Sequence, residues 1–79
     1  MITPRQLREL LTATPFRPFR IHMADGSSYD ITNHDMAIVE RNTVDIGMDR
    51  DPDGVAESLV RCAILHITRL EALQASVTH

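Results

Sequence analysis

The fold is decided by residues 19–31, which read FRIHMADGSSYDI. Apolar and polar side chains alternate on both sides of a central Asp-Gly, a pattern typical of two strands that each bury one face. A three-residue loop that ends at Gly26 pairs Ile21 with Tyr29 and places the apolar side chains of both strands on the same face. A two-residue loop would pair Ile21 with Asp30 instead. The sequence therefore predicts a hairpin with a three-residue loop, in which Gly26 takes the left-handed conformation that favours glycine.

A helix is predicted before this hairpin, over residues 3–14. Thr3 suits the N-cap position, and Gln6 stands three residues later, where a capping box requires it. Leu7, Leu10 and Leu11 form one apolar stripe at helical spacing. A helix of about three turns with a single stripe is not stable alone, so we expect it to pack on the strands.

The second half of the chain is less sharply patterned. Residues 36–39 and 43–48 predict a second hairpin, followed by an acidic loop over residues 49–54. Residues 59–70 form an apolar run that is compatible with two short strands, broken near Cys62, or with a helix. We favour the two strands because the run is rich in valine, isoleucine and threonine.

Length and charge limit the class of protein. Its 79 residues suit one domain. We expect a mainly β (α+β) fold with a five-strand small antiparallel barrel or a strongly bent sheet over residues 19–71, and a tail over residues 72–79. The net charge of −3 disfavours nonspecific binding of nucleic acid, which needs a basic surface. A single cysteine, no visible signal peptide and no apolar run of membrane-spanning length lead us to expect a cytoplasmic protein without a membrane partner.

Two resemblances add to this interpretation. The predicted order of elements resembles the small barrels of the Sm-like and Src-homology type: RIHMADGSSYDI (residues 20–31) looks like the first Sm-like hairpin, and HITRLEAL (residues 66–73) looks like a closing strand. The segments PFRPFRIHMADG (residues 15–26) and CAILHITRLEAL (residues 62–73) also resemble a set of short uncharacterised bacterial proteins of no known activity. The Sm-like resemblance implies nucleic-acid binding as the alternative function.

No motif in the sequence indicates catalysis. The segment Asp49–Gly54 imitates the first half of an EF-hand calcium loop but lacks the glutamate at the twelfth position, so we favour an acidic hairpin loop. Cys62 and His66 would meet only on a helix, and a buried structural cysteine is the favoured interpretation. No pair among His22, His34 and His66 has a recognised metal-ligand spacing. We therefore expect no enzyme, no cofactor and no metal.

The best candidate for an interaction face is a basic stretch near the start of the chain. Its members are Arg5, Arg8, Arg17, Phe19 and Arg20. Arginines interleaved with aromatic side chains are typical of proteins that bind single-stranded nucleic acid. We favour the alternative that the phenylalanines seat the helix, while the arginines stay solvated or pair with the acidic middle of the chain.

The sequence also favours self-association. The core of so short a chain is thin, no disulfide can reinforce it within the chain, and open strand edges invite a partner strand. The contact could come from the hairpin over residues 36–48 or from the run over residues 59–70. We expect a noncatalytic interaction module that forms a homo-oligomer, a dimer first and a ring second. The alternative is a monomer in which the N-terminal helix covers the open edge.

Overall fold

The computed structural model describes residues 1–73, so residues 74–79 of the predicted tail lie outside the described residues. The helix is α1 (Pro4–Thr12), and the strands are β1 (Phe19–Met23), β2 (Ser28–Ile31), β3 (Ala37–Val39), β4 (Thr43–Arg50), β5 (Ala56–Ala63) and β6 (Ile67–Ala72). Two short 3-10 helices, η1 (His34–Met36) and η2 (Ile64–His66), connect β2 to β3 and β5 to β6. The prediction of a mainly β fold with an N-terminal helix is confirmed.

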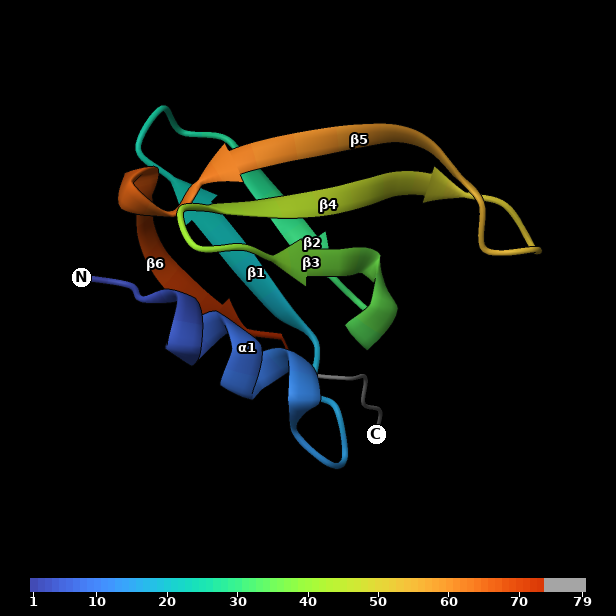
Figure 1. Cartoon of the computed structure of the whole chain (residues 1–79), viewed down its shortest axis with the longest axis horizontal. Helices are drawn as coiled ribbons and strands as arrows, with labels where there is room; N and C mark the ends of the chain where they lie inside the picture. Colours follow the sequence, from blue (N-terminus) through green and yellow to red (C-terminus); the bar gives the residue numbers. More distant parts are fainter. Residues whose placement is uncertain (74–79) are drawn as a thin grey trace.

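The strands form two antiparallel three-stranded sheets, in the orders β2-β1-β6 and β3-β4-β5 (Figure 1). The expectation of five strands in a small barrel or one strongly bent sheet is therefore wrong, because six strands form two separate sheets. The run over residues 59–70 contributes to both sheets, since β5 pairs with β4 while β6 pairs with β1. The chain changes sheet at η1 and again at η2, and each change separates two strands that a continuous barrel would join.

The first hairpin has the predicted register. Ile21 faces Tyr29, and Met23 donates a backbone hydrogen bond to the Ser27 carbonyl (2.9 Å), which closes the three-residue loop. Gly26 has φ +93°, in the left-handed region that L-residues avoid. The number of residues in the loop, three rather than two, therefore decides which side chains of β1 and β2 enter the core.

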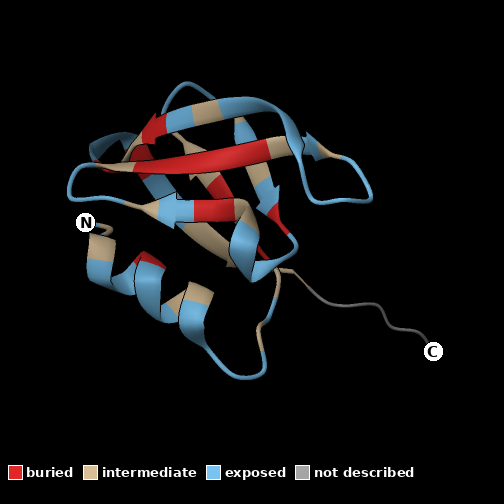
Figure 2. Cartoon of the chain, turned by 45° about the vertical axis from the view of Figure 1, so that its right-hand side comes forward, coloured by how far each residue is buried: buried red, intermediate tan, exposed pale blue. Residues whose placement is uncertain are grey.

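The core lies between the two sheets (Figure 2). Ile21 and Ile31 from the first sheet, and Val44 and Ile46 from the second, are fully buried. Leu7 of α1 is also fully buried, and α1 contacts β3 and η1. The predicted packing of the helix is therefore confirmed.

The ends of α1 follow the predicted signals closely. The Thr3 amide donates to Gln6 Oε1 (2.8 Å), and the Gln6 amide donates to Thr3 Oγ1 (3.2 Å), so the capping box is complete. The helix ends at Thr12, two residues before the predicted end, and Ala13 already has extended dihedral angles. Among residues 1–73, no helix has the length and apolar character needed to span a bilayer.

Candidate functional site

The structure does not bring the basic stretch together as one face. Phe19 has 3% of its surface exposed and belongs to the core, whereas Arg5, Arg8 and Arg17 are exposed on α1 and the connector that follows it. Arg20 neighbours Phe19 on β1 and points to the opposite face of the sheet, because side chains alternate along a strand. The aromatic member of the predicted face is therefore on the wrong side of the strand to bind a ligand with Arg20.

Arg20 is also engaged within the chain. Its guanidinium donates to both carboxylate oxygens of Asp30, at 3.1 Å for the Nη2–Oδ2 pair, and this hydrogen bonding lowers the pKa of Asp30. Glu71 lies 3.9 Å from the same guanidinium. Phe16 packs against the core beside Phe19, with 6.3 Å between the ring centroids. This arrangement matches the interpretation favoured from the sequence, in which the phenylalanines seat the helix and the arginines pair with the acidic middle of the chain.

Two further arginines pair with aspartates across strands and turns. Arg50 donates to Asp35 of η1 (2.7 Å), which lowers the pKa of Asp35. Arg61 donates to both carboxylate oxygens of Asp45, at 2.9 and 3.1 Å. These pairs distribute opposite charges over the surface and weaken the basis for a continuous basic groove.

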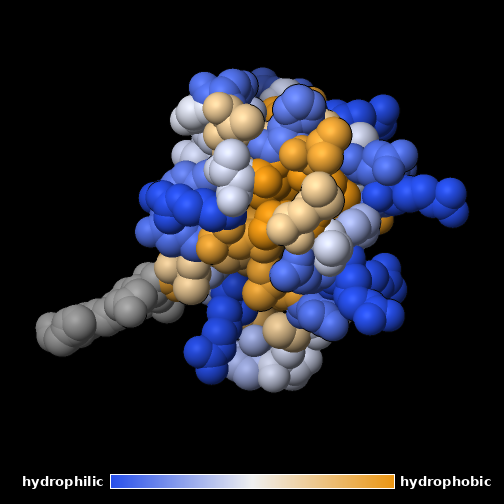
Figure 3. Space-filling model, turned by 90° about the vertical axis from the view of Figure 1, so that its left-hand side faces the viewer, coloured by the Kyte–Doolittle hydropathy of each residue, from blue (hydrophilic) through white to orange (hydrophobic). Residues whose placement is uncertain are grey.

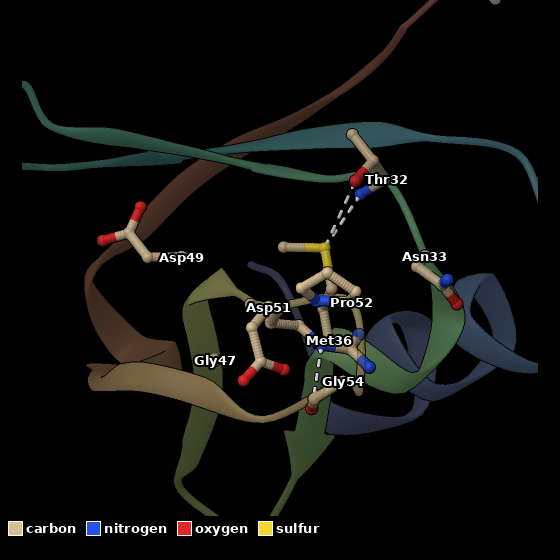
Figure 4. A pocket seen from close by; sticks show the side chains of 9 residues that line it. Thr32, Asn33, Met36, Gly47, Asp49, Asp51, Pro52 and Gly54 are labelled. Atoms are coloured by element: carbon tan, nitrogen blue, oxygen red, sulfur yellow. Dashed lines mark hydrogen bonds between the residues drawn. The ribbon is translucent and has the colours of Figure 1, made fainter.

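The acidic loop is organised by its own hydrogen bonds. The Asp51 carboxylate accepts hydrogen bonds from the backbone amides of Asp53 (3.0 Å) and Val55 (2.9 Å). An open hollow of about 440 Å³ lies beside this loop. In it, the Met36 sulfur accepts hydrogen bonds from Thr32, each at 3.3 Å (Figure 4). Within residues 1–73, no group of three or more His, Cys, Asp or Glu side chains is placed to hold a metal ion.

Cys62 and His66 lie on different elements. Cys62 is buried on β5, with 4% exposed, whereas His66 is exposed at the end of η2. Both line a hollow of about 220 Å³. Burial, with smaller contributions from Asp25 and Asp45, raises the pKa of the Cys62 thiol. A thiol in this environment stays protonated at neutral pH and is a poor nucleophile.

The outer edge of β5 overlaps the run over residues 59–70, which the sequence predicted as one possible contact for self-association, but it begins earlier, at Ala56. Within the described residues, this eight-residue strand pairs with β4 alone, and residues 56–59 and 61 are exposed. Leu59 has 62% of its surface exposed, and Val55 and Leu65 on either side of the strand have 63% and 72%. Three of the five exposed large apolar side chains described therefore lie within eleven consecutive residues.

The backbone groups along this edge have a defined orientation. Ile64 donates a hydrogen bond to the Asn42 carbonyl (2.9 Å), in the same register as the β4–β5 ladder. Facing residues in an antiparallel ladder alternate between hydrogen-bonded and non-hydrogen-bonded pairs, so Arg61 and Leu59 form non-hydrogen-bonded pairs with β4. Their backbone amides and carbonyls therefore point outward, away from β4.

A second apolar surface continues from the end of β5. The face that carries the N-terminus shows a cluster of apolar side chains (Figure 3). A hollow of about 380 Å³ lies there, lined by Met1, Ile2, Ile64 and Leu65 among others. Leu65 joins this hollow to the exposed end of β5, so the two surfaces are continuous. An apolar surface of this kind is typical of a contact with another protein.

Comparison of the chain with protein-family models, with curated proteins and with solved structures finds no match to any of them.

Proposed function

We propose that this chain is a noncatalytic interaction module that associates with itself through the outer edge of β5. The observation that carries the proposal is the length and exposure of that edge, with eight residues and Leu59 at its centre. An unpaired strand edge presents a row of amides and carbonyls that another strand can satisfy. Self-association is then the simplest way to pair them and to bury the exposed leucine.

The other edge of the same sheet supports this choice of surface. β3 has only three residues, and α1 packs against it. The alternative in which the helix covers an open edge thus fits β3, but β5 lies at the opposite edge of the sheet. The edge of β5 is accordingly the surface of this sheet that stays accessible to a partner.

Several polar side chains near the hollows have structural partners, which favours a binding module over an enzyme. Asp51 orders the acidic loop, Arg50 joins it to Asp35, and Arg61 pairs with Asp45. A catalytic group is usually a titratable side chain in a cleft whose pKa is shifted toward the working pH. The carboxyl pKa values that shift here are all lowered, and the pKa of Cys62 is raised.

Light scattering coupled to gel filtration tests the proposal across micromolar to millimolar concentrations. We expect the mass to rise from that of one 8.9 kDa chain toward a dimer as the concentration increases. Single-stranded RNA should leave the mass unchanged, because three of the arginines are paired within the chain. A mass of one chain at every concentration would contradict self-association, and an RNA-dependent shift that salt removes would favour nucleic-acid binding.

A further inference from the structure

We infer that β5 pairs with β5 of a second copy, antiparallel, about a twofold axis that passes through Leu59. This inference rests on the proposed self-association and specifies its partner and register. A twofold axis makes the contact self-complementary, so one surface serves both copies and the assembly closes as a dimer. The β3-β4-β5 sheets of the two copies then form one six-stranded sheet across the contact.

The orientation of the backbone permits this register. Leu59 points its amide and carbonyl outward, so Leu59 of each copy can donate one hydrogen bond and accept one at the axis. Arg61 also points its amide and carbonyl outward, so the regular pattern extends from Leu59 toward the end of β5. At Glu57 the ladder is irregular, because Asp49 opposite it has φ +57° and Asp51 donates a hydrogen bond to the Val55 carbonyl (3.0 Å). Between Leu59 and Ala63 the β4–β5 ladder needs no rearrangement, because it uses the backbone groups that alternate with the outward-pointing ones.

The side chains select this register among its neighbours. With the axis at Leu59, Glu57 lies opposite Arg61 of the second copy, and symmetry repeats this pair on the other side. An axis at Arg61 would place two arginines opposite each other, and an axis at Glu57 would do the same with two glutamates. Like charges at facing positions destabilise a sheet, whereas opposite charges stabilise it. With the axis at Ser58 or Val60, Glu57 of one copy would no longer face Arg61 of the other.

The same register gathers the exposed apolar side chains. The two copies of Leu59, each 62% exposed in one chain, meet at the axis. Toward the ends of the paired strands, Val55 of one copy lies opposite Ala63 of the other, next to the exposed Leu65. The contact thus has an apolar centre with one opposite-charge pair on each side of it.

Disulfide cross-linking tests the register. In an antiparallel pair that exchanges both hydrogen bonds, the facing Cα atoms are about 5.5 Å apart, within the range a disulfide spans. Leu59→Cys should therefore form a covalent dimer under mild oxidation, in most of the protein. Glu57→Cys is the matched control, because the two copies of residue 57 would lie four residues apart along the strands, about 13 Å. Native Cys62 is buried, and oxidation of the unsubstituted chain measures how much Cys62 itself contributes to cross-linking.

A second pair of variants tests the contact without covalent cross-linking. Leu59→Lys should weaken dimerisation by about 100-fold or more, because two ammonium groups would face each other at the axis. Ile38→Lys is its control, since Ile38 on β3 is 65% exposed and lies outside the contact. We expect that control to dimerise like the unsubstituted chain. Circular dichroism verifies that both variants are folded.

The outcomes separate this inference from the proposal on which it depends. Efficient cross-linking through position 59 but not position 57, with loss of dimer in Leu59→Lys alone, supports the twofold pairing. An oligomer that persists in Leu59→Lys, or that cross-links equally at both positions, overturns the pairing and leaves self-association intact. A chain that is monomeric at every concentration overturns both.

Discussion

The loop of the first hairpin allows a quantitative test of how the sequence determines the fold. Gly26 has φ +93°, and a Cβ atom built at this position would have no other atom within 4 Å. Replacing Gly26 with L-alanine therefore introduces no steric clash with the rest of the chain. Any loss of stability must come from the backbone conformation itself.

The expected magnitude follows from two opposing effects. An L-residue held in the left-handed region costs about 1–2 kcal/mol. Alanine also restricts the unfolded chain, which recovers about 0.4–1 kcal/mol. We therefore expect Gly26→Ala to lower the free energy of unfolding by about 1 kcal/mol, and the melting temperature by about 4–8 °C for a domain of this size. A β-branched residue such as valine should cost more, because it resists positive φ more strongly.

Chemical synthesis provides a matched control at the same position. D-alanine favours positive φ, so it should retain the restriction of the unfolded chain without the backbone strain, and raise stability by about 0.4–1 kcal/mol. Thermal and urea unfolding of the L- and D-alanine proteins, followed by circular dichroism, measures the difference. Equal stability of the two proteins would refute the argument that the left-handed conformation of Gly26 determines the hairpin loop.

Three further predictions concern the helix, the ion pairs and the cysteine. Leu7→Ala should lower the free energy of unfolding in urea by about 2–5 kcal/mol, since Leu7 is fully buried, and a loss under 1 kcal/mol would show that α1 is not docked. The pKa values of Asp30 and Glu71 are lowered by hydrogen bonds from Arg20 and His22, so the stability they add is present above about pH 4 and is lost as the pH falls through their folded-state values. Melting temperatures between pH 5 and pH 2 should therefore fall less steeply in Asp30→Asn than in the unsubstituted chain. Cys62 should react with a thiol reagent only once the chain is unfolded, because its side chain is buried and the pKa of its thiol is raised; fast labelling of the folded chain would contradict this.

The parts of the fold that local chemistry controls could be predicted from the sequence. The register of the first hairpin depends on a period of two and a loop of odd length, and both are visible in residues 19–31. The capping box needs only Thr3 and Gln6 at the right spacing. The division of residues 59–70 into two strands was also predicted, with the break at η2 just after the expected position.

The parts of the fold that depend on long-range arrangement could not be predicted from the sequence. Nothing local in residues 32–36 shows that the chain leaves one sheet at η1 and enters the other, so the prediction of a barrel was wrong. The count of five strands was also wrong, although the segments predicted over residues 19–31, 36–48 and 59–70 amount to six. The start of β5 was also missed, because residues 56–58 are exposed and polar or small, which resembles a loop. A strand at the edge of a sheet has less need of apolar side chains, and the period-two signal weakens there.

The predicted basic face shows a different limit of prediction from sequence. Phe19 and Arg20 are adjacent in sequence, and adjacent residues of a strand point to opposite faces. A cluster in sequence that crosses a strand therefore divides into two sets, one toward the core and one toward solvent. The burial of Phe19 and the pairing of Arg20 with Asp30 follow from that alternation. The contact that we propose is carried instead by the alternate residues 57, 59 and 61, which share a face of β5.

The charges on β5 can both prevent and direct association. Charged side chains on an edge strand normally keep it from pairing with unrelated strands, because each charge must find an opposite partner or lose its hydration. Glu57 and Arg61 are placed at equal distances on either side of Leu59. An unrelated strand leaves Glu57 without an opposite charge, whereas a second copy of this chain, running in the opposite direction, places Arg61, which also pairs with Asp45 of its own chain, opposite Glu57 in one register. The same pair of residues therefore disfavours indiscriminate pairing of the edge and favours the twofold dimer.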